Sequence, residues 1–366
     1  MIKNIFFKNM EINLNYYVLR TIFKLLNGLD LHNASQVSRS WLEAANDEKK
    51  ERGPMYIIKR RKKTTPHYNS EQVKKEIIEC CQVKPSLIML LYVPYSNAIL
   101  RGCYCNFLPV ECYLLSLEYN STIRNMIRPK KTVASMHFPD VPNIQISALT
   151  LKKNLKRPEI YCEELKLFFE NPLKNSEKLK TVFEEFFTYD SSMTSCLILL
   201  CNNINNVIAV DLVKSLKDWF PNKNFPLWGG MVDRISICTY VHNSRVCKVH
   251  ADSVAILIGG PEMKIWSVIL DQFCETKKVI ENKLKTFKES ITLRKHSIGF
   301  IFSSQFRENY LLALDSSMYH HYFPSVPLVN CFGHKSLGGS FDEAYKRISN
   351  NSSQIGDATL MILTYN

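Results

Sequence analysis

The chain contains twelve cysteines, a residue type that can bind metal ions or form disulfides. None forms a C-x-x-C pair, and no two clusters have zinc-finger spacing. Cys103, Cys105 and Cys112 would hold a metal only with a fourth ligand from elsewhere. Others, such as Cys196 and Cys201, flank apolar runs, where cysteine packs as a small hydrophobic residue. The sequence therefore predicts no metal site and no cofactor.

Catalysis would require a nucleophile next to a base, and the histidines offer the best arrangements. His320 and His321 lie near Asp315, and His250 lies near Asp252. Adjacent residues on a helix point to different sides, so His320 and His321 would not form one site. No G-x-S-x-G, H-E-x-x-H or phosphate-loop motif occurs. We predict a non-catalytic protein.

Two glycine pairs, Gly229-Gly230 and Gly338-Gly339, are expected to follow strand ends. Glycine permits positive φ and a close backbone approach there. The two glycine pairs either belong to loops that line a recognition cleft or form tight turns that bind no ligand, and the sequence favours neither interpretation.

The net charge of +13 predicts attraction to acidic surfaces. However, the basic residues are spread along the chain, and no nucleic-acid-binding motif occurs. Nucleic acid is therefore an unlikely partner. No apolar run reaches the length of a membrane span, and no secretory signal is evident. These features predict reduced cysteines and a cytoplasmic or nuclear protein without membrane contact. The basic run Lys59–Lys63 is either a nuclear import signal or a charged loop after a strand.

The elements that would position a site begin with two helical patterns between Leu14 and Lys50. Apolar residues recur at helical spacing on both sides of a turn at Asn27, Gly28 and Asp30. A unit of this size buries too little surface to be stable alone, so we expect it to need a partner.

The order of residues in this segment resembles the F-box. The residues that carry the resemblance are Leu19, Ile22, Phe23, Leu26, Asp30, Leu31, Ala34, Val37, Ser38, Arg39, Trp41, Leu42 and Asp47. Asn15 replaces the family's usual proline, and Ser38 replaces its usual cysteine. The resemblance implies docking to the Skp-family adaptor of cullin–RING ubiquitin ligases. It implies adaptor contacts through Leu14, Val18, Ile22, Val37 and Trp41. The alternative is a helical hairpin that packs only on its own domain.

A strand–helix–strand pattern occurs twice in the second half of the chain. Ile198 and Ile301 lie in the two first strands, 103 positions apart, and Phe220 and Phe323 end the two helices at the same spacing. Each helix ends in Phe-Pro, and each following strand begins with Pro-Leu. We interpret this as a duplicated unit around a pseudo-twofold axis.

Residues 226–233, PLWGGMVD, resemble the Gly-Gly-x-Val-Asp turn of FIST domains, and the blocks at 297–328 and 332–333 are also similar to that family. FIST domains occur in bacterial ligand-sensing proteins and in F-box proteins. Of the family's Cys-x-Gly-Arg-like run, only Arg307 remains here. The resemblance implies a substrate or ligand cleft with the following candidates: Gly229, Gly230, Asp233, Arg307, Gly333, Gly338 and Gly339.

Together these patterns predict an α+β protein. A leader (1–13) and a small all-α F-box (14–53) precede a mixed α/β FIST-like region. This region has an N-terminal part (54–190) and a C-terminal part (191–366), and the C-terminal part contains the duplicated unit. The predicted function is substrate recognition in a Skp–cullin–F-box ubiquitin ligase, with an adaptor, cullin and RING subunits and a protein substrate as partners. The alternatives are a FIST-type sensor with a small-molecule ligand and a basic nucleic-acid-binding protein.

Overall fold

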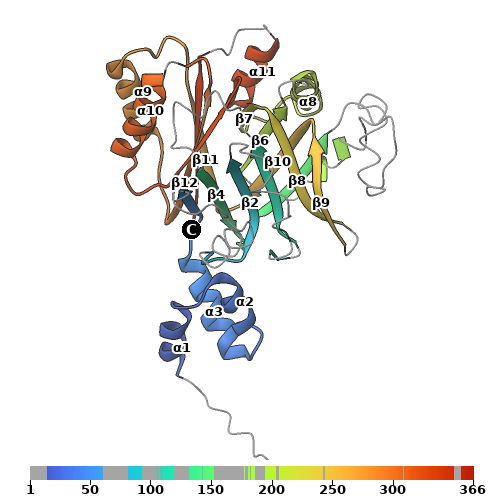
Figure 1. The fold of residues 1–366 in the computed structure, drawn as a ribbon, viewed down its shortest axis with the longest axis vertical. Helices are drawn as coiled ribbons and strands as arrows, with labels where there is room; N and C mark the ends of the chain where they lie inside the picture. The colour runs from blue at the N-terminus through green and yellow to red at the C-terminus, as the bar shows by residue number, and fades with distance from the viewer. Residues whose placement is uncertain are drawn as a thin grey trace, which may run out of the picture.

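The computed structural model of the chain describes residues 15–60, 81–92, 105, 108–109, 111–118, 132–141, 143–151, 177, 180–181, 183–185, 194–202, 206–241, 244–307, 309–349 and 356–366. The predicted leader, Leu14, residues 61–63 of the basic run and most of the charged segment 155–190 lie outside these residues. Figure 1 shows the three N-terminal helices as a small unit at one end of a larger body of strands.

The N-terminal unit contains three helices, α1 (Tyr16–Phe23), α2 (Gly28–Ala34) and α3 (Arg39–Glu51). The prediction of two helices was wrong because the chain caps one further helix, at Ser38, in addition to the one that begins at the predicted turn. The Asn27 side chain accepts a hydrogen bond from Asp30 N, and the Ser38 side chain accepts one from Trp41 N. Such caps satisfy backbone donors that a helix start otherwise leaves unpaired. The second predicted helix therefore splits into α2 and α3.

The body contains three sheets. The first, sheet A, has six strands in the order β1 (Met55–Arg60), β4 (Thr132–Pro139), β2 (Pro85–Tyr92), β3 (Tyr113–Glu118), β8 (Arg234–Val241) and β9 (Ser244–Ala251). β8 and β9 were not among the predicted strands.

Sheet B has the order β14 (Ser336–Ser340), β7 (Pro226–Val232), β6 (Thr194–Asn202), β10 (Ser253–Gly260) and β5 (Gln145–Leu151). Sheet C has the order β11 (Lys264–Leu270), β15 (Ala358–Tyr365), β12 (His296–Ser304) and β13 (Leu328–Gly333). Because β3 pairs with β8 and β5 with β10, strands from before and after residue 190 share sheets A and B.

The two strand–helix–strand units are present. In the first copy, α8 (Asn206–Trp219) connects the parallel strands β6 and β7. In the second copy, α10 (Asn309–Tyr322) connects the parallel strands β12 and β13. Each first strand also pairs antiparallel with a further strand, β6 with β10 and β12 with β15. The duplication seen in the sequence is therefore a duplication of topology.

Burial on both faces explains the continuous apolar runs in the strands. In β6, Ile198 faces the central core that the three sheets share, whereas Leu199 belongs to the cluster that contains residues of α8 and of α11 (Phe341–Ser349). In sheet C, Ile301 packs with residues of α10 and of α9 (Lys277–Ser290). Figure 1 shows α9 and α10 on one side of the body and α8 and α11 on another.

Candidate functional site

The N-terminal unit exposes an unusual share of apolar side chains. Seven of the thirteen large hydrophobic residues that are exposed in the described part of the chain lie on it. They are Tyr17, Val18, Ile22, Leu25, Leu29, Val37 and Leu42. Three of the predicted adaptor contacts belong to this set, and sequence reasoning missed the other four. A concentration of this kind is typical of a surface that binds another protein.

A separate hydrophobic core holds this surface in place. Leu19, Phe23 and Leu31 are buried between the helices together with Ala44 and Ala45. The exposed residues are thus not needed to close the unit on itself.

Trp41 differs from the other predicted adaptor contacts because it takes part in this core. It is partly buried, and its ring lies edge-on to Phe23 with the centroids 5.4 Å apart. A substitution at Trp41 would therefore disturb the helices as well as any docking surface. Leu14 lies outside the described residues.

Arg52 joins the helical unit to the body. Its buried guanidinium pairs with Glu48 at 3.0 Å and donates to the carbonyl of Phe23 at 2.7 Å. It donates to Leu26 O at 2.9 Å and also to the carbonyl of Gln82, which belongs to the body. One side chain therefore ties two turns of the helical unit to the segment before β2.

A second connection involves the start of β12. His296 Nε2 donates to the carbonyl of Lys50 at 2.7 Å, and Lys295 forms an ion pair with Glu51 at 2.7 Å. On another side, Gly28 N donates to Cys81 O at 2.9 Å. The helical unit is thus a distinct body with a fixed orientation relative to the strands.

The cleft glycines lie inside the packing between the sheets. Gly229 and Gly230 are within β7, and Gly338 and Gly339 are within β14, which pairs with β7. The prediction that they follow strand ends is wrong because their missing side chains permit close packing in the strands themselves. A Cβ atom on Gly229 would lie 1.9 Å from Leu199 O. All four are buried.

Gly333 lies at the end of β13 and is buried in the same way. A Cβ atom there would lie 2.0 Å from Met231 O. The absence of a side chain at Gly333 therefore allows the end of β13, in the second copy, to pass close to the end of β7, in the first. At this point Met231 O accepts a hydrogen bond from His334 N at 2.7 Å.

Asp233 forms the polar part of this crossing. Its carboxylate accepts a hydrogen bond from His334 Nε2 at 3.0 Å. The other ring nitrogen of His334 accepts from the Gln305 amide at 2.7 Å, which fixes the proton on Nε2. Ser304 donates to His334 O at 2.9 Å. The cluster is partly buried, and both ring nitrogens already have partners.

Arg307 is fully buried, and all five of its N–H donors are used within the chain. It pairs with Asp315 through two hydrogen bonds of 2.6 and 3.0 Å. The remaining donors reach the carbonyls of Gly356 at 3.0 Å, Cys274 at 3.1 Å and Asp271 at 3.4 Å. Burial raises the pKa of Asp315, and the Arg307 guanidinium opposes that effect. Arg307 therefore has no donor left for a ligand in this structure.

The arrangement of His320 and His321 near Asp315 is not assembled. Asp315 is engaged by Arg307, whereas His320 and His321 are exposed at the end of α10. His250 is exposed near the end of β9, and Asp252 follows that strand.

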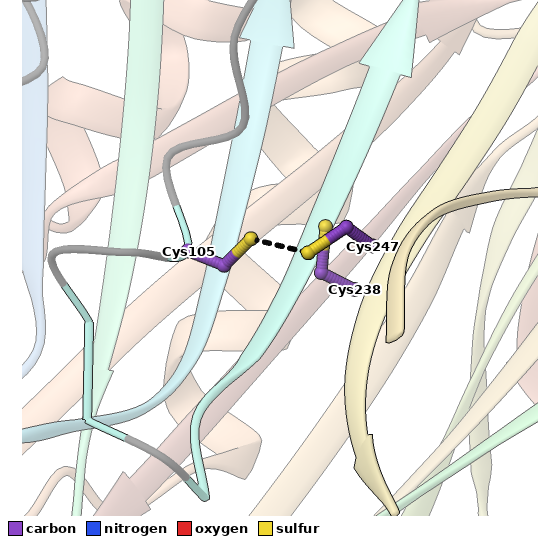
Figure 2. A group of neighbouring side chains, drawn as sticks. All are labelled: Cys105, Cys238 and Cys247. Carbon is purple, nitrogen blue, oxygen red and sulfur yellow. Dashed lines mark hydrogen bonds between the residues drawn. The ribbon is translucent and has the colours of Figure 1, made fainter. Parts of the chain in front are cut away.

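Three cysteines that the sequence did not connect lie together in the body. They are Cys105, Cys238 and Cys247, and Figure 2 shows their sulfur atoms converging from different segments. Cys112 belongs to the same hydrophobic cluster as Cys105 and Cys238 but not to the group of sulfur atoms. The signal that could have found this group is the pairing of two strands, β8 and β9, that had not been predicted.

Comparison with known families gives one match. Residues 12–52 match the F-box domain, a range that covers the helices α1 to α3. F-box domains bind the adaptor Skp1 and, through it, the cullin scaffold. No curated protein matches the chain. Among the described residues, no helix is both long enough and apolar enough to cross a membrane.

Proposed function

We propose that this protein is a substrate-recognition subunit of a Skp–cullin–F-box ubiquitin ligase. In this role the F-box helices dock the Skp-family adaptor, and the body binds a protein that is then ubiquitinated and degraded. The F-box match carries the proposal. A receptor of this kind needs no catalytic residue, because its contribution is to raise the effective concentration of substrate near the ubiquitin-loaded partner.

The exposed apolar side chains of the helical unit support adaptor docking. Val18 and Ile22 are four positions apart on α1 and therefore share one face, with exposed fractions of 45% and 39%. Their burial in an interface would remove apolar surface from water without reorganising the unit, since its own core is already closed.

The architecture of the body supports a recognition role. The duplicated unit and the Gly-Gly-x-Val-Asp segment resemble FIST domains, and F-box followed by a FIST-like region is the order in F-box only protein 22. The distinct helical unit and its fixed joint at Arg52 would hold the body in one orientation relative to the adaptor.

Adaptor binding is tested by Val18→Glu with Val279→Glu as a matched control. The two valines lie on helices, and their exposed fractions are 45% and 43%. A charge at position 18 should abolish co-purification with Skp1, whereas the same change on α9 should not. Equal binding by both variants, with intact helical circular dichroism, would contradict docking through α1.

Substrate recognition is tested by an affinity purification with the proteasome and neddylation inhibited. The full chain is compared with Val18→Glu, which keeps the body intact. Proteins that bind both forms, but accumulate in cells only when Val18→Glu replaces the natural chain, are the expected substrates. An absence of any such protein would contradict the receptor role while leaving adaptor docking untouched.

A groove on the body favours ligand sensing as a second candidate function. It has a volume of about 530 Å³ and lies between β11 and α9. Polar residues such as Asn282 and Lys283 line it together with Phe287. Thermal shifts against amino acids and related metabolites test this function, and Asn282→Ala should remove any shift that arises in the groove. Nucleic-acid binding, the third alternative, predicts an affinity for DNA that falls with salt.

A further inference from the structure

Cys105, Cys238 and Cys247 form a compact group of sulfur atoms. All three Sγ atoms lie within 4.8 Å of one another, and those of Cys105 and Cys247 are 2.9 Å apart. Cys105 and Cys238 are buried, whereas Cys247 is exposed. Figure 2 shows that the side chains point toward one another. The group therefore has two inner sulfur atoms and one at the surface.

The fold brings this group together by two independent contacts. Thr239 pairs with Val246, and Cys238 and Cys247 are the neighbours of this pair on the two strands. The pairing register shifts at this point, between Ile237 and Thr239, and the sulfur atoms of Cys238 and Cys247 lie within 4.8 Å of each other. Arg245, two residues before Cys247, donates to the carbonyls of Leu108 and Pro109. It thereby holds the segment that follows Cys105 against β9.

Clustered thiolates favour soft metal ions. Thiolate ligands select Zn²⁺ and Cu⁺, and a tetrahedral Zn²⁺ has Zn–S bonds of about 2.3 Å. Ligand sulfur atoms around such an ion are about 3.8 Å apart, which follows from the bond length and the tetrahedral angle. One separation of 2.9 Å and a limit of 4.8 Å for all three bracket this value, so the sulfur atoms already lie close to the spacing that such an ion requires.

We propose that Cys105, Cys238 and Cys247 bind one thiophilic metal ion, Zn²⁺ or its chemical equivalents, in the reduced protein. The exposed side of the group leaves a coordination position for water or a further ligand. Such an ion would join the segment at Cys105 to the β8–β9 hairpin and so stabilise the outer face of sheet A. This site is separate from the adaptor surface and does not depend on the proposed function.

The oxidation state of Cys105 would control the site. Cys105 is disulfide-bonded in this structure, whereas Cys238 and Cys247 are in the thiol form. A thiol or phosphine reductant supplies the two electrons and, with two protons, converts the disulfide to two thiols. Metal binding then releases a proton from each of the three thiols that coordinate the ion.

The test uses the full chain, reduced with a phosphine and titrated with Co²⁺ and then Zn²⁺. The expected result is one metal ion per chain and a near-ultraviolet sulfur-to-cobalt charge-transfer band that Zn²⁺ displaces. Cys247→Ser should weaken or remove the band without unfolding the protein, because Cys247 is exposed. Cys238→Ser, at a buried position, should also weaken or remove the band.

Cys112→Ala is the matched control. Its sulfur lies in the same hydrophobic cluster but outside the metal-binding group, so this variant should keep the band. No band in the reduced natural chain would overturn the proposal, as would an unchanged band in the Cys238→Ser and Cys247→Ser double variant.

Discussion

The carboxylate of Asp233 accepts a hydrogen bond of 3.0 Å from Nε2 of His334, and the two residues directly follow corresponding strands of the duplicated unit. Asp233 follows β7 of the first copy, and His334 follows β13 of the second. The copies are therefore joined at equivalent ends by a pair of unlike residues. The two copies share one topology, and the contact between them forms because the residues at these two equivalent positions differ.

We expect Asp233→Ala and His334→Ala each to destabilise the body by about 1 to 2 kcal/mol, the usual cost of losing a partly buried hydrogen bond. The double variant should cost less than the sum, because either single change already breaks the bond. Urea unfolding of the two single variants and the double variant measures this coupling. His321→Ala, at an exposed histidine, is the control; additive effects would show that the pair does not interact.

Arg307→Met should destabilise the protein by about 3 to 5 kcal/mol, because it leaves the buried carboxylate of Asp315 without its partner. The double variant with Asp315→Leu should recover much of that loss, since it removes the buried charge as well. Chemical unfolding compares the two. If the single variant lost less than about 1 kcal/mol, the buried pair would not be the structural element described here.

Arg52→Ala should loosen the helical unit relative to the body while leaving the exposed residues of α1 unchanged. We expect Skp1 to bind as before and small-angle X-ray scattering to show a broader range of shapes. Lys295→Ala is the control, because its ion pair with Glu51 is exposed and should contribute little. A scattering profile identical to that of the natural chain would contradict the role of Arg52 at the joint.

His137 should make stability depend on pH. It is buried in β4 with Ser135 and Cys81 as hydrogen-bond partners, and burial lowers its pKa to about 4 from 6.5. Between these values the unfolded chain binds more protons than the folded one. Stability is therefore complete above pH 6.5 and falls as the pH drops toward 4, by about 3 kcal/mol for this group.

His137→Gln keeps a polar side chain but cannot titrate, so its stability should change less over this range. Urea unfolding at several pH values between 7 and 4 compares the variant with the natural chain. Parallel pH profiles would show that another group controls the acid response.

The elements that the sequence predicted are those with a strong local signal. β2, β6 and β12 are continuous apolar runs, and the repeat of Phe-Pro and Pro-Leu revealed the duplication. β8 and β9 have no continuous apolar run, but polar and apolar residues alternate in them, and this period of a half-buried strand is the signal that could have indicated them. β14 was missed because its two glycines are typical of a turn, and only the neighbouring strand makes them necessary.

The candidate sites show the same limit. Helical spacing placed Val18 and Ile22 on one apolar helix face. It could not show that Trp41 contributes to the core of the helical unit while Leu25 is exposed. Arg307 was identified only through the resemblance to FIST domains. Its partner Asp315 was considered only as a neighbour of His320 and His321. Cys238 and Cys247 needed the register of β8 and β9, which depends on long-range packing rather than on local sequence.

The strand β14 follows the second copy in the sequence but completes the sheet of the first by pairing with β7. The two copies therefore cannot be separated into independent fragments. A chain cut before residue 334 would leave the edge of β7 without its partner and prone to pairing with other chains. The same cut also removes β15 from the middle of sheet C, so a peptide that carries residues 334–366 should restore such a truncated chain in trans, as an exchanged strand does in a swapped dimer.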